Sequence, residues 1–179
     1  MSNIEIIHGS CVNQEVDAIV NAANKYLLAG SGICGAIFKT AGYTELTNAC
    51  NNINTPLNDG DAVITPAFNI TTTKCIIHAV GPDFRQTPNS FDKLFNAYYN
   101  SLLVLKDNNL QSISFPLISA GIFGYGLKNP AKISAEQCIK AYNKFIVDYP
   151  DYDIYVKLCA YSDNEYEEIK RSIWPFLII

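Results

Sequence analysis

The stretch AIVNAANKYLLAGSGICGAIFKTA, residues 18–41, decides the fold class. It begins with the short apolar run Ala18–Asn21, continues through a glycine-containing loop, and ends in a helical pattern from Ile33 to Ala41. An apolar run of this length between turn signals is typical of a strand that is buried on both faces. A strand, a loop and a helix in this order predict an α/β fold with a largely parallel sheet.

The same alternation continues along the rest of the chain. Further strands are predicted at Ile4–His8, Ala62–Pro66, Lys74–Val80, Ser112–Leu117 and Ile154–Ala160. Helices are predicted at Thr44–Asn52, at Phe91–Leu105 with Ser90 as N-cap, after the cap and proline pair Asn129-Pro130, and at Asp163–Trp174. With no repeat, linker or low-complexity tract, we expect one domain over residues 1–179.

Composition limits the classes of protein to which the chain can belong. Hydrophobic residues make up 49% of the 179 residues and charged residues 17%, which is enough for a core and excludes a disordered chain. The net charge is −4, from 17 acidic and 13 basic side chains. This balance argues against a protein that binds many phosphates of DNA or RNA, but it allows one small phosphorylated ligand.

The N-terminus and the cysteines indicate the compartment. The start MSNIEIIHGS has neither a charged leader nor a long apolar run, so we expect no signal peptide, no membrane anchor and a cytoplasmic location. The six cysteines are widely spaced and form no C-x-x-C pair. They are therefore expected to be buried, reduced thiols, and no metal site is predicted.

Two familiar phosphate-binding motifs are matched only in part. The segment Gly30–Gly35 fits G-x-G-x-x-G, but eight residues separate it from the preceding strand, and no acidic residue ends a strand about twenty residues further on. A dinucleotide fold of the Rossmann type is therefore disfavoured. A P-loop needs glycine directly before lysine, and Phe38 stands before Lys39.

A more general reading of the glycine loops remains. The helix from Ile33 begins after one loop, and its first N–H groups lie at the positive end of the helix dipole. A second loop, Ser119–Gly126, follows the strand Ser112–Leu117. Both loops leave the carboxyl ends of strands, where open α/β sheets bind ligands, so they predict a site for a diphosphate beside a sugar. The alternative is two tight turns that are needed only for packing.

Four segments together resemble one known family. They are VNAAN (residues 20–24), GSGICGAI (30–37), HAVGP (78–82) and PLISAGIFG (116–124). In order and spacing they are similar to the motifs of the macro domains, and the resemblance extends over about residues 4 to 174. It implies a three-layer α/β/α sandwich with a mixed, mostly parallel central sheet, and a cleft for ADP-ribose at the strand ends.

The resemblance also implies a role for each site residue. Asn24 would bind the distal ribose and be the catalytic residue, Phe123 would pack against that ribose, and Tyr161 would lie beside the adenine. The backbone of the second loop would cradle the diphosphate. The full predicted site consists of Ser10, Cys11, Ala22, Ala23, Asn24, Gly32, Ile33, Cys34, Ser119, Ala120, Gly121, Ile122, Phe123 and Tyr161, with no cofactor.

Two positions depart from the family pattern. Ser10 stands where the family usually has the Asp that holds the adenine amino group, and a hydroxyl is a weaker, uncharged acceptor. Cys34 stands where hydrolases of the MacroD type carry Asp, and a neutral thiol is a poor base. Cys34 would act as a nucleophile only with a base beside it, and His78 is expected to be an interior histidine.

The resemblance to the macro domains implies a hydrolase that removes mono-ADP-ribose from acidic side chains of proteins. Water would attack the anomeric carbon of the distal ribose, and the substrate's own phosphate would position that water. The alternative is a reader that binds ADP-ribose or an ADP-ribosylated partner without chemistry, while binding of adenine-rich RNA is disfavoured by the charge. We expect a monomer that binds no membrane.

Overall fold

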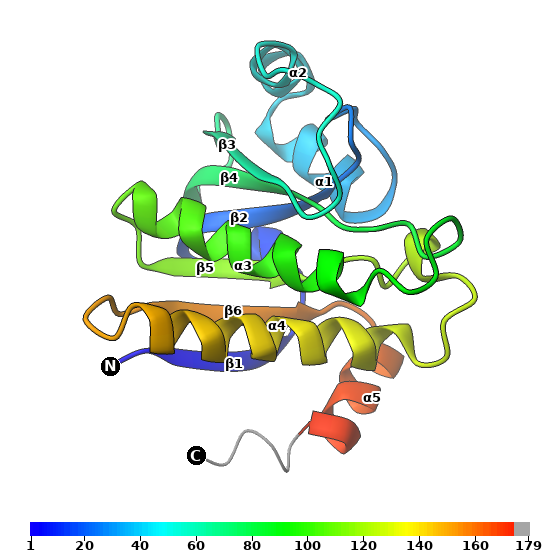
Figure 1. Cartoon of the computed structure of the whole chain (residues 1–179). Coiled ribbons are helices and arrows are strands. Elements are labelled where there is room, and N and C mark those ends of the chain that lie inside the picture. The colour runs from blue at the N-terminus through cyan, green and yellow to red at the C-terminus, as the bar shows by residue number, and fades with distance from the viewer. Residues whose placement is uncertain (174–179) are drawn as a thin grey trace.

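The computed structural model describes residues 1–173 and contains a six-stranded sheet with the order β1-β6-β5-β2-β4-β3 (Figure 1). The strands are β1 (Asn3–His8), β2 (Val16–Ala23), β3 (Ala62–Pro66), β4 (Thr73–Val80), β5 (Ser112–Pro116) and β6 (Tyr155–Ala160). Every pair is parallel except β3–β4, so the mixed, mostly parallel sheet is confirmed.

Strand β2 is longer than the sequence predicted. It begins at Val16, which pairs with Thr73, and ends at Ala23, which pairs with Val80. Polar Asp17 and the two alanines Ala22 and Ala23 carry little strand preference of their own. Pairing with β4 extends β2 beyond the apolar run at both ends, whereas β5 pairs only with Ala18 and Ile19 inside it; local propensity could not show this.

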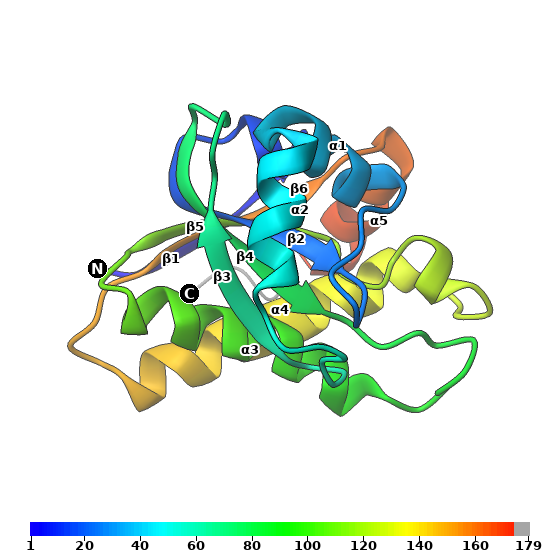
Figure 2. The ribbon, with the colours of Figure 1, turned by 90° about the horizontal axis from the view of Figure 1, so that it is seen from above.

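Helices cover both faces of the sheet and complete the three layers (Figures 1 and 2). They are α1 (Gly32–Ala41), α2 (Tyr43–Asn51), α3 (Phe91–Asp107), α4 (Pro130–Asp148) and α5 (Asp163–Ile173). Helices α3, α4 and α5 share one apolar core with the sheet, whereas α1 and α2 pack on the other face with the short helix η1 (Cys11–Asn13). The three-layer α/β/α fold is confirmed; Trp174, the predicted end of α5, lies outside the described residues.

The predicted helix caps are corrected in one respect. Ser90 and Asn129 occupy the N-cap positions of α3 and α4, but neither side chain makes a capping hydrogen bond. Asn129 has a left-handed backbone (φ 58°), and Pro130 follows as the first helical residue. The start of α4 is therefore set by the backbone angles of Asn129 and Pro130 and not by a side-chain cap.

The parallel pairing brings the carboxyl ends of the strands to one edge of the sheet. Strands β1, β6, β5 and β2 are all parallel, so the loops that follow them leave on the same side, at right in Figure 1. These loops are residues 24–31 after β2, 117–129 after β5, and the short turns after β1 and β6. This edge is where an open α/β sheet binds its ligand.

A buried hydroxyl network fixes the start of the loop after β5. The Ile118 N–H donates to the Tyr98 hydroxyl at 3.0 Å, and the Ser134 hydroxyl donates to the Ile118 carbonyl at 2.5 Å. The hydroxyls of Tyr98 and Ser134 are themselves 2.6 Å apart. Both polar groups of the Ile118 backbone are thus satisfied by side chains of α3 and α4.

A second buried network joins strands β2, β4 and β3. The Asn21 amide donates to His78 Nδ1 at 3.0 Å, and His78 Nε2 lies 2.9 Å from the Thr65 hydroxyl. Since an amide N–H can only donate, His78 carries its proton on Nε2. Burial lowers the pKa of His78 to about 4, so the ring is neutral near pH 7. His78 is the interior histidine that the sequence predicted.

Two further expectations from the sequence concern the cysteines and membrane-spanning helices. All six cysteines are buried and free, as predicted. Within residues 1–173, every helix is too short or too polar to cross a membrane.

We expect Tyr98→Phe to lower the free energy of unfolding by about 1–3 kcal/mol, because it leaves the buried Ile118 N–H without a partner. Urea unfolding measures this loss. Tyr155→Phe is the control, because Tyr155 is 44% exposed and its change should stay within about 0.5 kcal/mol. Equal stability of the two variants would contradict the role of the Tyr98 hydroxyl.

His78 should make stability depend on pH. The pKa of His78 is lower in the folded state, about 4, than its ordinary value of 6.5, so the unfolded chain binds the proton first as the pH falls. The free energy of unfolding therefore falls as the pH drops from about 6.5 to about 4. Outside that window the contribution of His78 to this free energy is constant. Urea unfolding at pH 7 and pH 5 should show a loss about 1–2 kcal/mol larger in the wild type than in His78→Gln. An equal loss in the two proteins would refute the assignment.

Candidate functional site

Two adjoining cavities form a groove at the carboxyl edge of the sheet. The first, about 420 Å³, is called the Asn24 cavity; the second, about 410 Å³, is called the Tyr161 cavity. The Asn24 cavity is lined by Ala22, Ala23, Asn24, Gly30, Ser31, Gly32, Ile33, Cys34, Leu117, Ser119, Gly121, Ile122 and Phe123. The Tyr161 cavity is lined by Gly9, Ser10, Cys11, Gly32, Ile33, Ala36, Pro116, Leu117, Gly121, Cys159, Tyr161 and Glu165. Gly32, Ile33, Leu117 and Gly121 line both cavities and mark the middle of the groove.

Asn24 organises the loop that follows β2. Its Oδ1 accepts hydrogen bonds from the N–H groups of Tyr26 (3.1 Å) and Leu28 (3.0 Å), and its Nδ2 donates to the Leu28 carbonyl at 2.8 Å. The buried Leu27 takes a left-handed backbone (φ 54°) within this turn. Both lone pairs of Oδ1 are used, which leaves one Nδ2 hydrogen for a ligand. Asn24 is thus both a loop-forming residue and a donor to the cavity.

The first glycine loop ends at the N-terminus of α1. Gly32 has φ +60°, which favours glycine, and it begins the helix. The N-cap residue, Ser31, makes no side-chain capping bond. The first N–H groups of α1, on Gly32, Ile33 and Cys34, therefore face the groove without an intrahelical partner.

The loop after β5 has a strained backbone that distant residues hold in place. Ser119 is left-handed (φ 59°), and its hydroxyl donates to the Pro82 carbonyl at 2.8 Å. A Cβ on Gly81 would lie only 2.3 Å from Ser119 Oγ, so only glycine fits beside it. The Phe84 N–H donates to the Phe123 carbonyl at 2.8 Å and fixes the far end of the loop.

This second loop also presents unpaired N–H groups. In the described part of the chain, no backbone hydrogen bond uses the N–H groups of Gly121, Ile122 or Phe123. They lie in and before the short helix η2 (Ile122–Gly124), and their residues line the same cavity as the start of α1. Two sets of backbone donors therefore face one groove, an arrangement that binds anions.

Cys34 is poorly suited to act as a base or a nucleophile. It is only 6% exposed, and burial raises its pKa; the Gly30 N–H and the Asn21 amide offset this only in part. Its thiol lies 3.6 Å from the Leu28 carbonyl, to which it donates. Both ring nitrogens of His78 are already hydrogen-bonded, one to Asn21 and one to Thr65. The thiol is therefore protonated at neutral pH and has no base beside it.

The Tyr161 cavity carries different chemistry. The Ser10 hydroxyl accepts the Val12 N–H at 3.3 Å and caps η1, while the Cys11 thiol is buried and donates to the Val20 carbonyl. Tyr161 follows β6 and is 78% exposed, with its ring free for a flat ligand. Glu165 lies in the first turn of α5 and lines the same cavity.

The structure brings the predicted residues together around this groove. Of the predicted residues, only Ala120 is absent from the described linings of the two cavities. The sequence reasoning missed Gly9, Gly30, Ser31, Ala36, Pro116, Leu117, Cys159 and Glu165. Proximity in sequence was a usable signal for four of these residues, because each lies close to a predicted residue in the chain: Gly9, Gly30, Ser31 and Leu117. Glu165 had only one signal, the S-x-x-E pattern at the start of α5.

Within residues 1–173, no group of three or more His, Cys, Asp or Glu side chains is placed to hold a metal ion. The described lining of the groove contains no Lys, Arg or His either. An anion there would be held by backbone N–H groups.

Comparison with known proteins agrees with this architecture. The model of the Macro domain family matches residues 20–134. An uncharacterised protein of Fusobacterium nucleatum is 43% identical over 143 residues, which are 79% of this chain and 80% of that protein. An O-acetyl-ADP-ribose deacetylase of Citrobacter rodentium is 42% identical over 149 residues, 81% of each chain.

Solved structures show the same likeness. The Oceanobacillus iheyensis macrodomain with ADP superposes with a TM-score of 0.88 and 33% identity, over 98% of this chain and 92% of that one. The Trypanosoma brucei macrodomain in complex with ADP-ribose gives a TM-score of 0.80 with 28% identity, over 95% of this chain and 68% of that one. By sequence and by structure, the chain belongs to the macro domain family.

Proposed function

We propose that this macro domain binds ADP-ribose in the groove and hydrolyses an ester between the distal ribose and an acyl group. The observation that carries the proposal is the pair of unpaired N–H sets, on α1 and on the loop after β5, that belong to residues lining one cavity. Two kinds of relative support the proposal: one from Citrobacter rodentium is named an O-acetyl-ADP-ribose deacetylase, and solved macrodomains contain ADP or ADP-ribose.

The diphosphate would lie in the middle of the groove. Gly32, Ile33 and Gly121 line both cavities, so their N–H groups can reach a diphosphate that joins the two ends of the ligand. The rest of ADP-ribose then divides between the cavities, with the distal ribose in the Asn24 cavity and adenosine in the Tyr161 cavity. Fixed backbone donors hold the anion without reorganisation, which favours a single orientation of the ribose.

The chemistry at the distal ribose would depend on orientation. The free Nδ2 hydrogen of Asn24 would donate to a ribose hydroxyl, and Phe123 would pack against the sugar. The protonated Cys34 thiol supplies no base. A water held by the substrate's own phosphate would therefore attack the ester and release the carboxylic acid.

Two substrates share this acyl ester, O-acetyl-ADP-ribose and a protein that is mono-ADP-ribosylated on an acidic side chain. For the second substrate we propose attack at the anomeric carbon. The relative named as a deacetylase favours the first, and the open mouth of the groove, lined by the 49% exposed Ile122, leaves room for the second.

A reader without catalysis is the second candidate function. The observation that favours it is Cys34, which leaves the described lining of the Asn24 cavity without a carboxylate to activate water. Binding would then use the same N–H groups, and only turnover separates the two candidates.

Gly121→Glu should abolish binding of ADP-ribose while the fold survives. A Cβ on Gly121 meets no atom within 4 Å, so the side chain fits, but its charge would lie against the diphosphate. Calorimetry of the wild type should give a micromolar dissociation constant for ADP-ribose, which corresponds to a binding free energy of about −8 kcal/mol. AMP should bind more weakly. Gln86→Glu, which adds the same charge at an exposed turn residue, is the control and should bind like the wild type. Unchanged binding by Gly121→Glu would exclude the groove.

Turnover should depend on Asn24 and not on the Cys34 thiol. Asn24→Ala should slow hydrolysis of O-acetyl-ADP-ribose about a hundredfold, because the ribose loses its alignment, and binding should fall less. Cys34→Ala should change the rate little, as should the buried control Cys138→Ala. Cys34→Asp should leave the rate unchanged or raise it.

The same assay is repeated with a transferase that is auto-modified on glutamate. Loss of activity in Cys34→Ala but not in Cys138→Ala would show that the thiol takes part in the reaction. Binding of ADP-ribose without turnover of either substrate over hours would establish the reader function.

A further inference from the structure

The groove has one charged side chain, and it lies at one end. Among the described residues that line the two cavities, Glu165 alone carries a charge. It is half-buried and shares the Tyr161 cavity with Ser10 and Tyr161. A carboxylate repels a diphosphate, so this end of the groove is suited to a part of the ligand that donates hydrogen bonds.

Glu165 is held in place by the start of α5. Its Oε2 accepts the Ser162 N–H at 3.1 Å, and the Ser162 hydroxyl accepts the Glu165 N–H at 3.2 Å. This reciprocal pair is a capping box, which fixes the side chain in the first helical turn. Within the described residues, Oε1 makes no hydrogen bond and remains available as an acceptor.

Ser10 supplies the complementary group in the same cavity. Its hydroxyl oxygen already accepts the Val12 N–H, so its hydrogen is free to donate. The cavity therefore offers an acceptor from α5 and a donor from the loop after β1. Adenine matches this pair, because its exocyclic amino group donates and the ring nitrogens beside it accept. The sugar hydroxyls and phosphates of ADP-ribose carry no N–H group.

Building on the proposed function, we propose that Glu165 is the residue that selects adenine over other purines, by accepting a hydrogen bond from the exocyclic amino group. The Ser10 hydroxyl donates to the neighbouring ring nitrogen, and the exposed Tyr161 ring covers the base. The adenine-selecting carboxylate thus comes from the helix after the last strand, while the loop after the first strand contributes a neutral hydroxyl.

The test compares ADP-ribose with inosine diphosphate ribose, in which a carbonyl replaces the amino group. By calorimetry the wild type should prefer ADP-ribose by about tenfold or more, because a carboxylate that faces a carbonyl oxygen loses a charge-assisted hydrogen bond. In Glu165→Gln the carboxamide oxygen stays on the Ser162 N–H, and the Nε2 group that replaces Oε1 is a donor that suits the carbonyl and not the amino group, so the preference should fall to about threefold or less. Gln also preserves the capping box, so melting should be unchanged.

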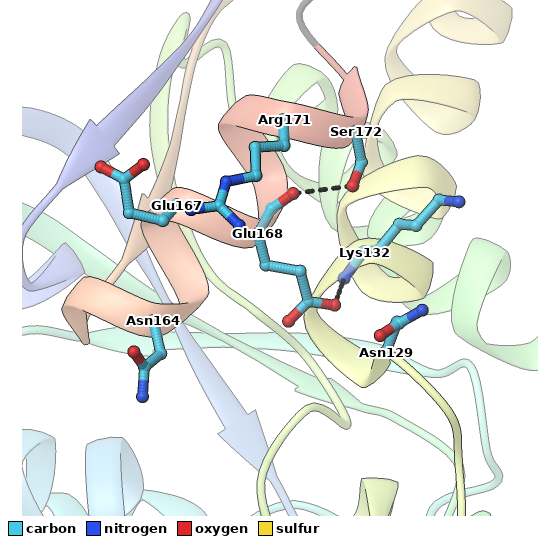
Figure 3. A pocket seen from close by; sticks show the side chains of 7 residues that line it. All are labelled: Asn129, Lys132, Asn164, Glu167, Glu168, Arg171 and Ser172. Atoms are coloured by element: carbon cyan, nitrogen blue, oxygen red, sulfur yellow. Dashed lines mark hydrogen bonds between the residues drawn. The ribbon is translucent and has the colours of Figure 1, made fainter.

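The matched control is Glu167→Gln on the same helix. Glu167 lines a separate hollow of about 370 Å³ between α5 and α4, together with Lys132 and Arg171 (Figure 3). Removing this charge lowers the net negative charge by the same amount, yet the wild-type preference should persist. Adding Ser10→Asp to Glu165→Gln should restore the preference for adenine, since it returns a carboxylate to the cavity.

The outcomes separate this inference from the proposed function. A wild type that binds both ligands equally, or a preference that survives in Glu165→Gln, overturns the role of Glu165 and leaves ADP-ribose binding intact. An equal loss of the preference for adenine in Glu167→Gln also overturns the role of Glu165, because the loss would then follow from the change in net charge and not from a contact with the base. A wild type that binds neither ligand overturns the proposed function and this inference with it.

Discussion

Backbone N–H groups without a partner inside the protein are the constraint on which this groove depends. An unpaired N–H that is buried away from water costs about 1–3 kcal/mol, so a fold keeps unpaired N–H groups where water or a ligand can reach them, as at the exposed Gly32, Gly121 and Ile122. Here they occur at the start of α1 and around Gly121, two segments that line one groove. Because the described lining contains no basic side chain, these N–H groups would be the donors that hold an anion in the proposed function.

Holding two such loops at a fixed separation requires contacts from distant parts of the chain. Tyr98 and Ser134 fix the backbone of Ile118, where the second loop begins. Ser119 bonds to Pro82, and Gly81 makes the space for it. The segments HAVGP and PLISAGIFG therefore form one unit, and their joint occurrence in the sequence has a steric cause. Contacts within the protein hold this loop, so its donors are in place before a ligand arrives.

The groove divides its chemistry between its two ends. At the Asn24 end the lining is neutral, the Cys34 thiol keeps its proton, and most of the Asn24 amide is committed to the loop. A reaction there would rely on orientation and on groups of the substrate. At the Tyr161 end one carboxylate and one hydroxyl offer directional hydrogen bonds. In the proposed function, selectivity for the ligand would therefore be concentrated away from the position of the chemistry.

The sequence by itself determined the strands, the helices and the position of the glycine loops. Apolar runs located all six strands and 3–4 periodicity located the helices α3 and α4, because these signals are local, and the four segments in register indicated the family. The full length of β2 and the helix starts without side-chain caps depended on pairing and backbone angles that a local pattern does not contain.

Only the tertiary structure decided which side chains share the groove. Asn24 was expected to bind a ligand, and its second role, three hydrogen bonds within its own loop, follows from how the chain turns after β2. Glu165 lies 155 residues from Ser10 in the chain, and parallel pairing of β1 with β6 brings their loops to one cavity. Local sequence specifies elements through short-range preferences, whereas a site is assembled by strand order, which depends on contacts between residues far apart in the chain.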